Sequence, residues 1–132
     1  MPSIRTKRVY EPPNLKDGHR ILVDRVWPRG MTKRRLQADV WLKRVAPSTE
    51  LRKWFDHDPA KWDEFRHRYF LELDRNPQGL AELMHALESG HVTLLYSARN
   101  NEQNHAVALK EYLSAHRHPL SSVRRREPSP RS

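Results

Sequence analysis

The sequence contains no cysteine among its 132 residues. Disulfides, thiolate metal sites and every mechanism with a cysteine nucleophile are therefore excluded. Nowhere does the chain reach the about 18 consecutive apolar residues of a membrane span, and the N-terminal stretch MPSIRTKRVYEPP lacks the apolar core of a signal peptide. We therefore expect a soluble, cytoplasmic protein with no membrane partner.

Glycine is scarce, with four residues, and these do not form the glycine-rich loop of known phosphate-binding motifs. The eight histidines show no HExxH or similar spacing, so we predict no metal site and no cofactor. Ser97 lacks the GxSxG surroundings of a hydrolase nucleophile. Motifs of known enzymes therefore do not identify a reaction, and whether the protein is an enzyme stays open.

Positive charge is abundant, with 25 Lys and Arg against 16 Asp and Glu, a net charge of +9. Residues 117–132 carry +4 of this excess and leave +5 for the rest of the chain. That C-terminal segment is rich in proline, serine and arginine and has too little apolar surface to order itself. We predict a single domain over residues 1–116, a flexible basic tail over 117–132, and anionic partners.

Apolar runs and capping residues indicate an α/β layout. The runs Ile21–Val23 and Leu94–Tyr96 predict buried strands within segments 19–27 and 91–97, and residues 4–10 predict a further edge strand. Helical spacing and capping residues predict helices over 36–44, from Ser48 to Phe55, from Asp58 through Leu73, from Asn76 to Gly90, and over 102–115. The predicted fold class is α/β, a small, largely parallel sheet flanked by helices in one domain.

In such sheets, ligands bind beyond the carboxyl ends of the strands. Two strands end in polar sequences, DRVWPRG at 24–30 and the loop from Ser97 to His105. If these strands are parallel neighbours, their ends converge on one site. The pairing order itself is not predicted.

The loop offers Asn104 as a helix cap and His105 as a hydrogen-bond donor to an oxyanion, or as an acid or base. In DRVWPRG, strand alternation places Arg25 and Trp27 on one face and Asp24 on the other. Arg25 and Arg29 would bind an anion, and Trp27 would stack on a ring. Plain capping in the loop, and an internal ion pair for Asp24 beside a core Trp27, are the alternatives.

The predicted site contains two kinds of residue. The candidate catalytic residues, which would handle a proton, are His105 and Asp24. The candidate ligand-binding residues are Arg25, Trp27, Arg29, Tyr96, Ser97 and Asn104.

The motifs KRVYEPP, DGHRILVDRVWPRG, APSTELRKWF, FRHRYFLEL and TLLYSARNNEQNHAVALKEYL resemble the YeaO-like family of bacterial proteins, domain of unknown function 488. The resemblance covers roughly residues 5 to 114, and it implies one cytoplasmic α/β domain without supplying a reaction. Broader relatives can carry a cysteine near the end of the last strand. Tyr96 and Ser97 stand there in this chain, so thiol chemistry is not carried over.

These observations lead to one main functional hypothesis and two alternatives. The main hypothesis is a protein that binds an anionic small molecule, a phosphate ester or nucleotide, at the carboxyl ends of its strands, with acid–base chemistry on that ligand left open. The first alternative is a nucleic-acid-binding accessory or regulatory module that uses the basic surface and the arginine-rich tail. The second alternative is a scaffold without a small ligand.

Overall fold

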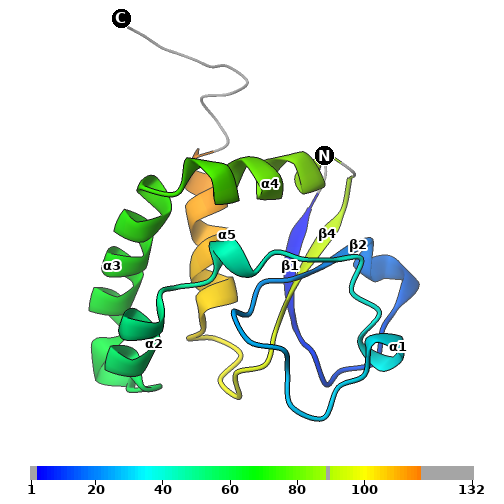
Figure 1. Cartoon of the computed structure of the whole chain (residues 1–132), viewed down its shortest axis with the longest axis horizontal. Helices are drawn as coiled ribbons and strands as arrows, with labels where there is room; N and C mark the ends of the chain where they lie inside the picture. Colours follow the sequence, from blue (N-terminus) through cyan, green and yellow to red (C-terminus); the bar gives the residue numbers. More distant parts are fainter. Residues whose placement is uncertain (1–2, 89, 117–132) are drawn as a thin grey trace, which may run out of the picture.

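The computed structural model describes residues 3–88 and 90–116. In this part of the chain, four strands form one sheet in the order β1-β4-β2-β3, and every neighbouring pair is parallel (Figure 1). The strands are β1 (Ile4–Arg8), β2 (His19–Leu22), β3 (Val40–Trp41) and β4 (Val92–Tyr96). The helices are α1 (Lys33–Leu36), α2 (Thr49–Phe55), α3 (Trp62–Asp74), α4 (Pro77–Leu87) and α5 (His105–His116). This arrangement confirms the predicted fold class; the predicted tail, 117–132, lies outside the described residues.

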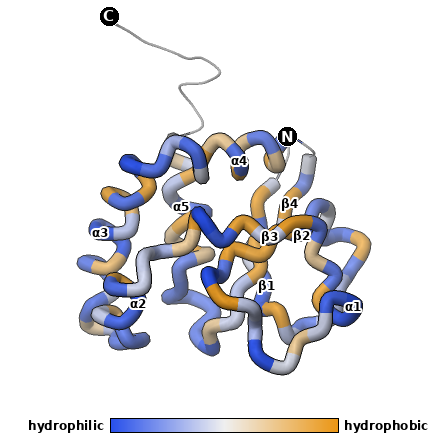
Figure 2. The backbone as a smooth tube through the Cα atoms, viewed as in Figure 1, coloured by the Kyte–Doolittle hydropathy of each residue, from blue (hydrophilic) through white to orange (hydrophobic). Residues whose placement is uncertain are grey.

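The sheet is covered unequally on its two faces. Helices α2 to α5 pack on one face over a large apolar cluster that includes Ile21 and Leu94 (Figure 1). The opposite face carries a smaller cluster, with Leu22, Leu95 and Leu36 of the short helix α1. Because successive residues of a strand point to opposite faces, the apolar runs of β2 and β4 supply both clusters, and Figure 2 shows these strands as hydrophobic segments between more polar ones.

Strand β2 lies beside β4 in parallel, with His19 opposite Val92 and Leu22 opposite Leu95. The ladder continues by one bond beyond β2, from the Val23 N–H to the Leu95 carbonyl at 3.1 Å. Gly18 permits this close approach, because its φ is +68° and an added Cβ would lie 2.3 Å from the His91 carbonyl oxygen. The carboxyl ends of both strands therefore reach the same edge of the sheet.

The predicted helix starts are largely confirmed. The side chains of Ser48, Asp58 and Asn76 each accept a hydrogen bond from a backbone N–H of the helical turn that follows. Asp58 caps a 3₁₀ turn, Pro59–Lys61, which runs directly into α3. In the described part of the chain, no helix has the length and apolar character needed to cross a membrane.

The prediction of a helix over 36–44 is wrong. The helix there ends at Leu36, because Gln37 adopts a left-handed conformation with φ +52°. Val40 and Trp41 then form β3, an edge strand that pairs with Ile21 and Leu22 of β2. The i, i+4 spacing of Leu36 and Val40 is helical, but hydrogen bonding to the neighbouring strand overrides this local pattern.

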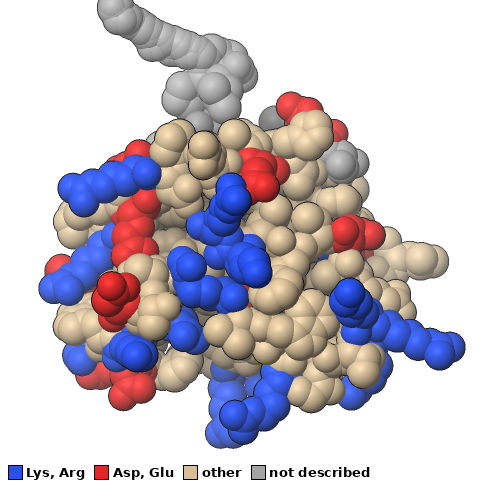
Figure 3. All heavy atoms as spheres, viewed as in Figure 1, with Lys and Arg blue, Asp and Glu red and all other residues tan. Residues whose placement is uncertain are grey.

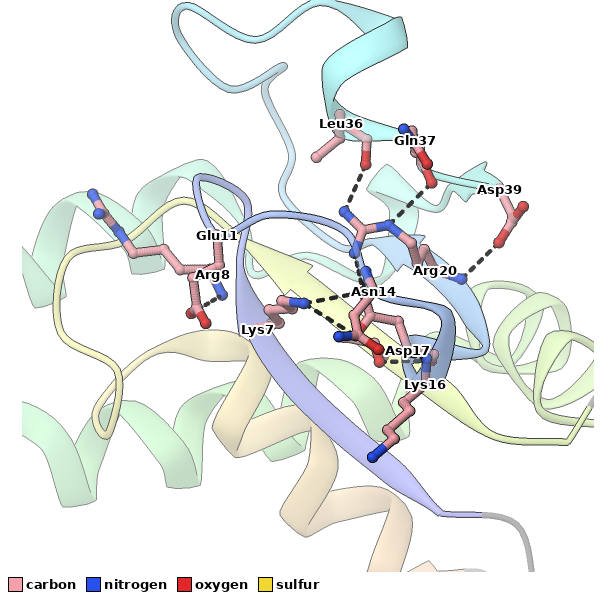
Figure 4. A network of polar contacts seen from close by, with 11 residues as sticks. Lys7, Arg8, Glu11, Asn14, Lys16, Asp17, Arg20, Leu36, Gln37 and Asp39 are labelled. Carbon is pink, nitrogen blue, oxygen red and sulfur yellow. Dashed lines mark hydrogen bonds and ion pairs between the residues drawn. The ribbon is translucent and has the colours of Figure 1, made fainter.

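The thinly covered face is held by a buried network of charges (Figure 4). The guanidinium of Arg20 pairs with the Asp17 carboxylate and donates to the carbonyls of Leu36 and Gln37 at 2.6 and 3.1 Å. Lys7 of β1 donates to the same carboxylate at 3.1 Å. Burial alone would raise the pKa of Asp17, but hydrogen bonds from the Asn14 backbone and from both cations outweigh it and lower that pKa.

Replacing Arg20 with alanine is expected to destabilise the fold by about 3 kcal/mol, because the Asp17 carboxylate loses its closest buried cation. Urea unfolding at neutral pH measures this free energy. Arg66→Ala is the matched control, since Arg66 pairs with Glu111 at the surface and its removal should cost less than about 1 kcal/mol. Equal losses in the two variants would contradict the assigned role of the network.

Acid is expected to weaken the same network. Because the pKa of Asp17 is lower in the folded than in the unfolded chain, its stabilising contribution is complete above the ordinary carboxyl pKa of about 4 and is lost as the pH falls through the folded value. Urea midpoints measured across this acidic range should decline less steeply for Asp17→Asn than for the unmodified protein. Parallel declines would show that other carboxylates control acid unfolding.

Candidate functional site

A cavity of about 850 Å³ opens at the carboxyl edge of the sheet. Segments that follow all four strands contribute to its wall, as the parallel arrangement requires. Helices α2 and α3 close one side of it. The lining residues are Arg8, Tyr10, Asp24, Arg25, Val26, Trp27, Pro28, Arg29, Ala46, Pro47, Arg52, Phe55, His57, Phe65, Ser97, Ala98, Arg99, Asn100, Gln103, Asn104 and His105.

The cavity lining is strongly basic. Among the described residues that form it, five are arginines and one, Asp24, is a carboxylate. The arginines are Arg8, Arg25, Arg29, Arg52 and Arg99. Figure 3 shows lysine and arginine side chains at the lower centre of the molecule, the direction in which β1 and β4 run in Figure 1. Positively charged side chains therefore outnumber negatively charged ones in the cavity lining.

Asp24 links the ends of the two central strands. One carboxylate oxygen, Oδ2, accepts the backbone N–H of Ser97 at 3.1 Å, directly after β4. The other, Oδ1, lies 3.0 Å from Nε2 of His105, the first residue of α5. That nitrogen also lies 3.1 Å from the Val23 carbonyl, to which its N–H is better directed, so Oδ1 has no well-aligned hydrogen bond among the described residues.

The lining of this one cavity thus includes predicted residues from both polar segments. They are Asp24, Arg25, Ser97, Asn104 and His105. Asn104 caps α5, since its side-chain oxygen accepts from the Val107 N–H at 3.0 Å and its amide donates to the Asn100 carbonyl at 2.8 Å. These bonds correspond to the capping interpretation of the loop and occupy both ends of the Asn104 amide.

Strand alternation predicts that Arg25 and Trp27 share one face, but the structure differs. Strand β2 ends at Leu22, so neither residue lies in a regular strand. The Arg25 guanidinium donates through Nε to the Pro47 carbonyl at 3.0 Å and through Nη2 to that of Ala46 at 3.1 Å. Trp27 instead packs in the smaller apolar cluster, with its indole N–H on the Met31 carbonyl. Both residues nevertheless line the cavity.

Arg29 and Tyr96, two further predicted ligand-binding residues, have different surroundings. Arg29 is exposed at the cavity, where its carbonyl accepts from the Tyr10 hydroxyl at 2.8 Å. Tyr96 is 2% exposed and is not part of the lining, so its ring is not available for stacking. Burial raises the pKa of Tyr96, and the nearby Glu11 carboxylate adds to the shift.

Several lining residues are not among the predicted site residues: Arg8, Tyr10, Arg52, His57 and Arg99. Arg8 ends β1 and Arg99 lies within the loop already chosen, so the rule that ligands bind at strand ends could have found both. Arg52 and His57 belong to α2 and the turn after it, and their sequence neighbourhood carries no signal that α2 packs beside the strand ends.

Together, fold and site define a class: a small α/β protein with a parallel sheet and an arginine-lined cavity at the carboxyl ends of its strands. The described residues include no group of three or more His, Asp or Glu side chains arranged to hold a metal ion. The chain belongs to the DUF488 family, because residues 3–130 match the family model described as DUF488-N3i, the inactive DUF488-N3 subclade. This confirms the resemblance seen in the sequence.

Curated relatives extend the match. The chain is 46% identical over 111 residues to YeaO of Escherichia coli, covering 84% of this chain and 96% of YeaO. It is 41% identical over 111 residues to Rv3073c of Mycobacterium tuberculosis and to Mb3100c of Mycobacterium bovis, covering 84% of this chain and 93% of each relative. The names of these proteins describe them as uncharacterized. No solved structure matches the chain.

Replacing Asp24 with alanine is expected to destabilise the protein by about 2 kcal/mol, because the partly buried Ser97 N–H loses its hydrogen-bond acceptor. Asp24→Asn should lose less, since its amide oxygen can still accept from Ser97. Urea unfolding of both variants measures the difference. The same loss in both would assign the stabilisation to the negative charge and remove the role of the Ser97 hydrogen bond.

Proposed function

We propose that the cavity binds an anionic small molecule that carries a phosphate ester, such as a nucleotide. The observation that carries this proposal is the imbalance of five arginines against one carboxylate in the lining. That carboxylate, Asp24, is 6% exposed and already contacts His105 and Ser97. Its one negative charge offsets one of the five positive charges in the lining, so an entering anion would still meet an excess of positive charge.

Arg25 is already oriented for binding. Its Nε and Nη2 are held by backbone carbonyls, which leaves the remaining N–H groups of a fixed guanidinium plane for a ligand. A side chain that is ordered in advance loses little conformational entropy when an anion binds. The cavity volume of about 850 Å³ lies in the range of about 300–1,000 Å³ typical of small-molecule sites.

The observations support binding of a ligand in the cavity better than catalysis on that ligand. The family description names this subclade inactive. In addition, Nε2 of His105 faces the Val23 carbonyl and the Asp24 carboxylate, so this nitrogen is occupied within the protein. We therefore assign Asp24 and His105 to positioning the cavity wall rather than to proton transfer with the ligand.

Nucleic-acid binding through the arginine-rich segment 117–132 is a second candidate, favoured by the net charge of +9. It differs from the first in its salt dependence, because each phosphate engaged steepens the fall of affinity with salt. Removal of residues 117–132 would weaken nucleic-acid binding strongly and leave phosphate-ester binding in the cavity intact.

A thermal-shift titration with inorganic phosphate, ribose 5-phosphate and AMP tests the cavity. A ligand that binds the folded protein alone must raise its melting temperature, and a hundredfold excess over the dissociation constant stabilises by about 2.7 kcal/mol. Arg25→Ala and Arg29→Ala should reduce the shift. Arg34→Ala, which removes an exposed arginine of α1 outside the cavity, should retain it. Undiminished shifts in both cavity variants would exclude this site.

A further inference from the structure

Tyr10 is an exposed aromatic residue of the cavity lining. It follows β1 and is 41% exposed. The lining contains three other phenylalanine, tyrosine or tryptophan rings, Trp27, Phe55 and Phe65, and each of them packs in or against one of the two apolar clusters. Neither cluster of the described chain includes Tyr10. Among these four lining rings, Tyr10 therefore has the most area available to pack against a ligand.

Two contacts hold the Tyr10 ring in place. Its hydroxyl donates to the carbonyl of Arg29, in the segment that follows β2, at 2.8 Å. The Arg8 guanidinium lies over one face of the ring, with Cζ 4.8 Å from the ring centre, and its Nε donates to the Ala98 carbonyl at 3.0 Å. Because Arg8 occupies one face, the exposed area of the ring belongs to the opposite face and the edge. A ring that is ordered in advance loses little conformational entropy when a ligand packs against it.

Exposed apolar surface accompanies the positive charge of the cavity. The described part of the chain has four exposed large hydrophobic residues, Tyr10, Leu15, Val26 and Leu71. Two of the four, Tyr10 and Val26, line the cavity, and Val26 is 58% exposed. Small-molecule sites typically combine an apolar lining with a few polar groups that fix the orientation of the ligand. A sugar phosphate without an apolar part would leave this area in contact with water.

We propose that the phosphate ester bound in the cavity carries a flat aromatic ring, and that Tyr10 packs against this ring. This inference rests on the proposed function and names the part of the ligand that carries no phosphate. Excess positive charge attracts the phosphate, while an aromatic ring packs on the free face or the edge of Tyr10. Nucleoside monophosphates have this chemistry, and so does flavin mononucleotide (FMN). Since every base has a π-face, stacking alone selects for the presence of a ring rather than for one base.

Calorimetric titration of the full chain compares four probes, AMP, FMN, ribose 5-phosphate and adenosine. Ribose 5-phosphate is the control without an aromatic ring, and adenosine is the control without a phosphate. We expect AMP to bind about tenfold more tightly than ribose 5-phosphate, which lies within the contribution of one base stacked on an aromatic side chain. Adenosine should bind more weakly than AMP. These comparisons use the unmodified protein and do not depend on the folding of any variant.

Variants test whether Tyr10 produces the preference for AMP over ribose 5-phosphate. Tyr10→Leu should reduce this preference to near one, because it removes the ring and keeps an apolar side chain. Tyr10→Phe should keep most of it, since the ring remains and only the bond to Arg29 is lost. Leu71→Ala shortens an exposed apolar side chain of α3 outside the cavity, and this matched control should leave the preference unchanged.

The ratio of the two affinities isolates the ring from the phosphate. Any displacement of Arg8 in Tyr10→Leu would act on the phosphate of both probes and cancel in the ratio. The affinity for ribose 5-phosphate should therefore change less than the affinity for AMP. Urea unfolding curves confirm that the compared variants are folded.

The outcomes separate this inference from the proposed function. If ribose 5-phosphate binds as tightly as AMP, or if the preference survives Tyr10→Leu, the inference fails and phosphate binding stands. If adenosine binds as tightly as AMP and Tyr10→Leu weakens both, the proposed function fails and ring recognition stands. If none of the four probes binds, both fail. Tighter binding of FMN than of AMP supports the inference with a flavin as the ring, and the reverse order supports it with a nucleobase.

Discussion

Parallel pairing of β2 with β4 is the constraint on which the cavity depends. The two strands run in the same direction, so the residues that follow Leu22 and Tyr96 leave the sheet at one edge. Gly18 makes the pairing sterically feasible, because any side chain at this position would collide with the His91 carbonyl. With an antiparallel arrangement, Asp24 and Ser97 would lie at opposite edges, and the contact between them could not form.

The proposed function divides the cavity residues into binding groups and positioning groups. Asp24, His105 and Asn104 have their polar atoms directed mainly at protein partners, and they join β2, β4 and α5 at the centre of the sheet edge. The five arginines belong to the same lining, and Arg8 and Arg25 each use only part of the guanidinium on backbone carbonyls. An excess of cations is costly in a folded protein unless water or an anion solvates it, and this cost is the physical basis of the ligand that we propose.

The two faces of the sheet are stabilised by different means. Four helices bury one face in a large apolar cluster, whereas the other has a small apolar cluster and the ionic network of Asp17, Arg20 and Lys7. This network attaches the end of α1 to β1 and β2. The segment that leads from β2 to α1 contains Trp27 and Arg29, so the network also fixes where that part of the cavity wall begins and ends.

The sequence by itself determined the class of fold, both central strands, most helix starts and two segments of the site. Apolar runs, capping residues and strand-end polarity are local properties, and each can be read without knowing what lies nearby. Tertiary structure alone decided the rest. Val40 and Trp41 became a strand because β2 offered hydrogen bonds. Tyr96 was buried in the larger apolar cluster, and Arg52 joined the cavity because α2 packs beside the strand ends. These outcomes depend on contacts between residues far apart in the chain, and local sequence does not encode them.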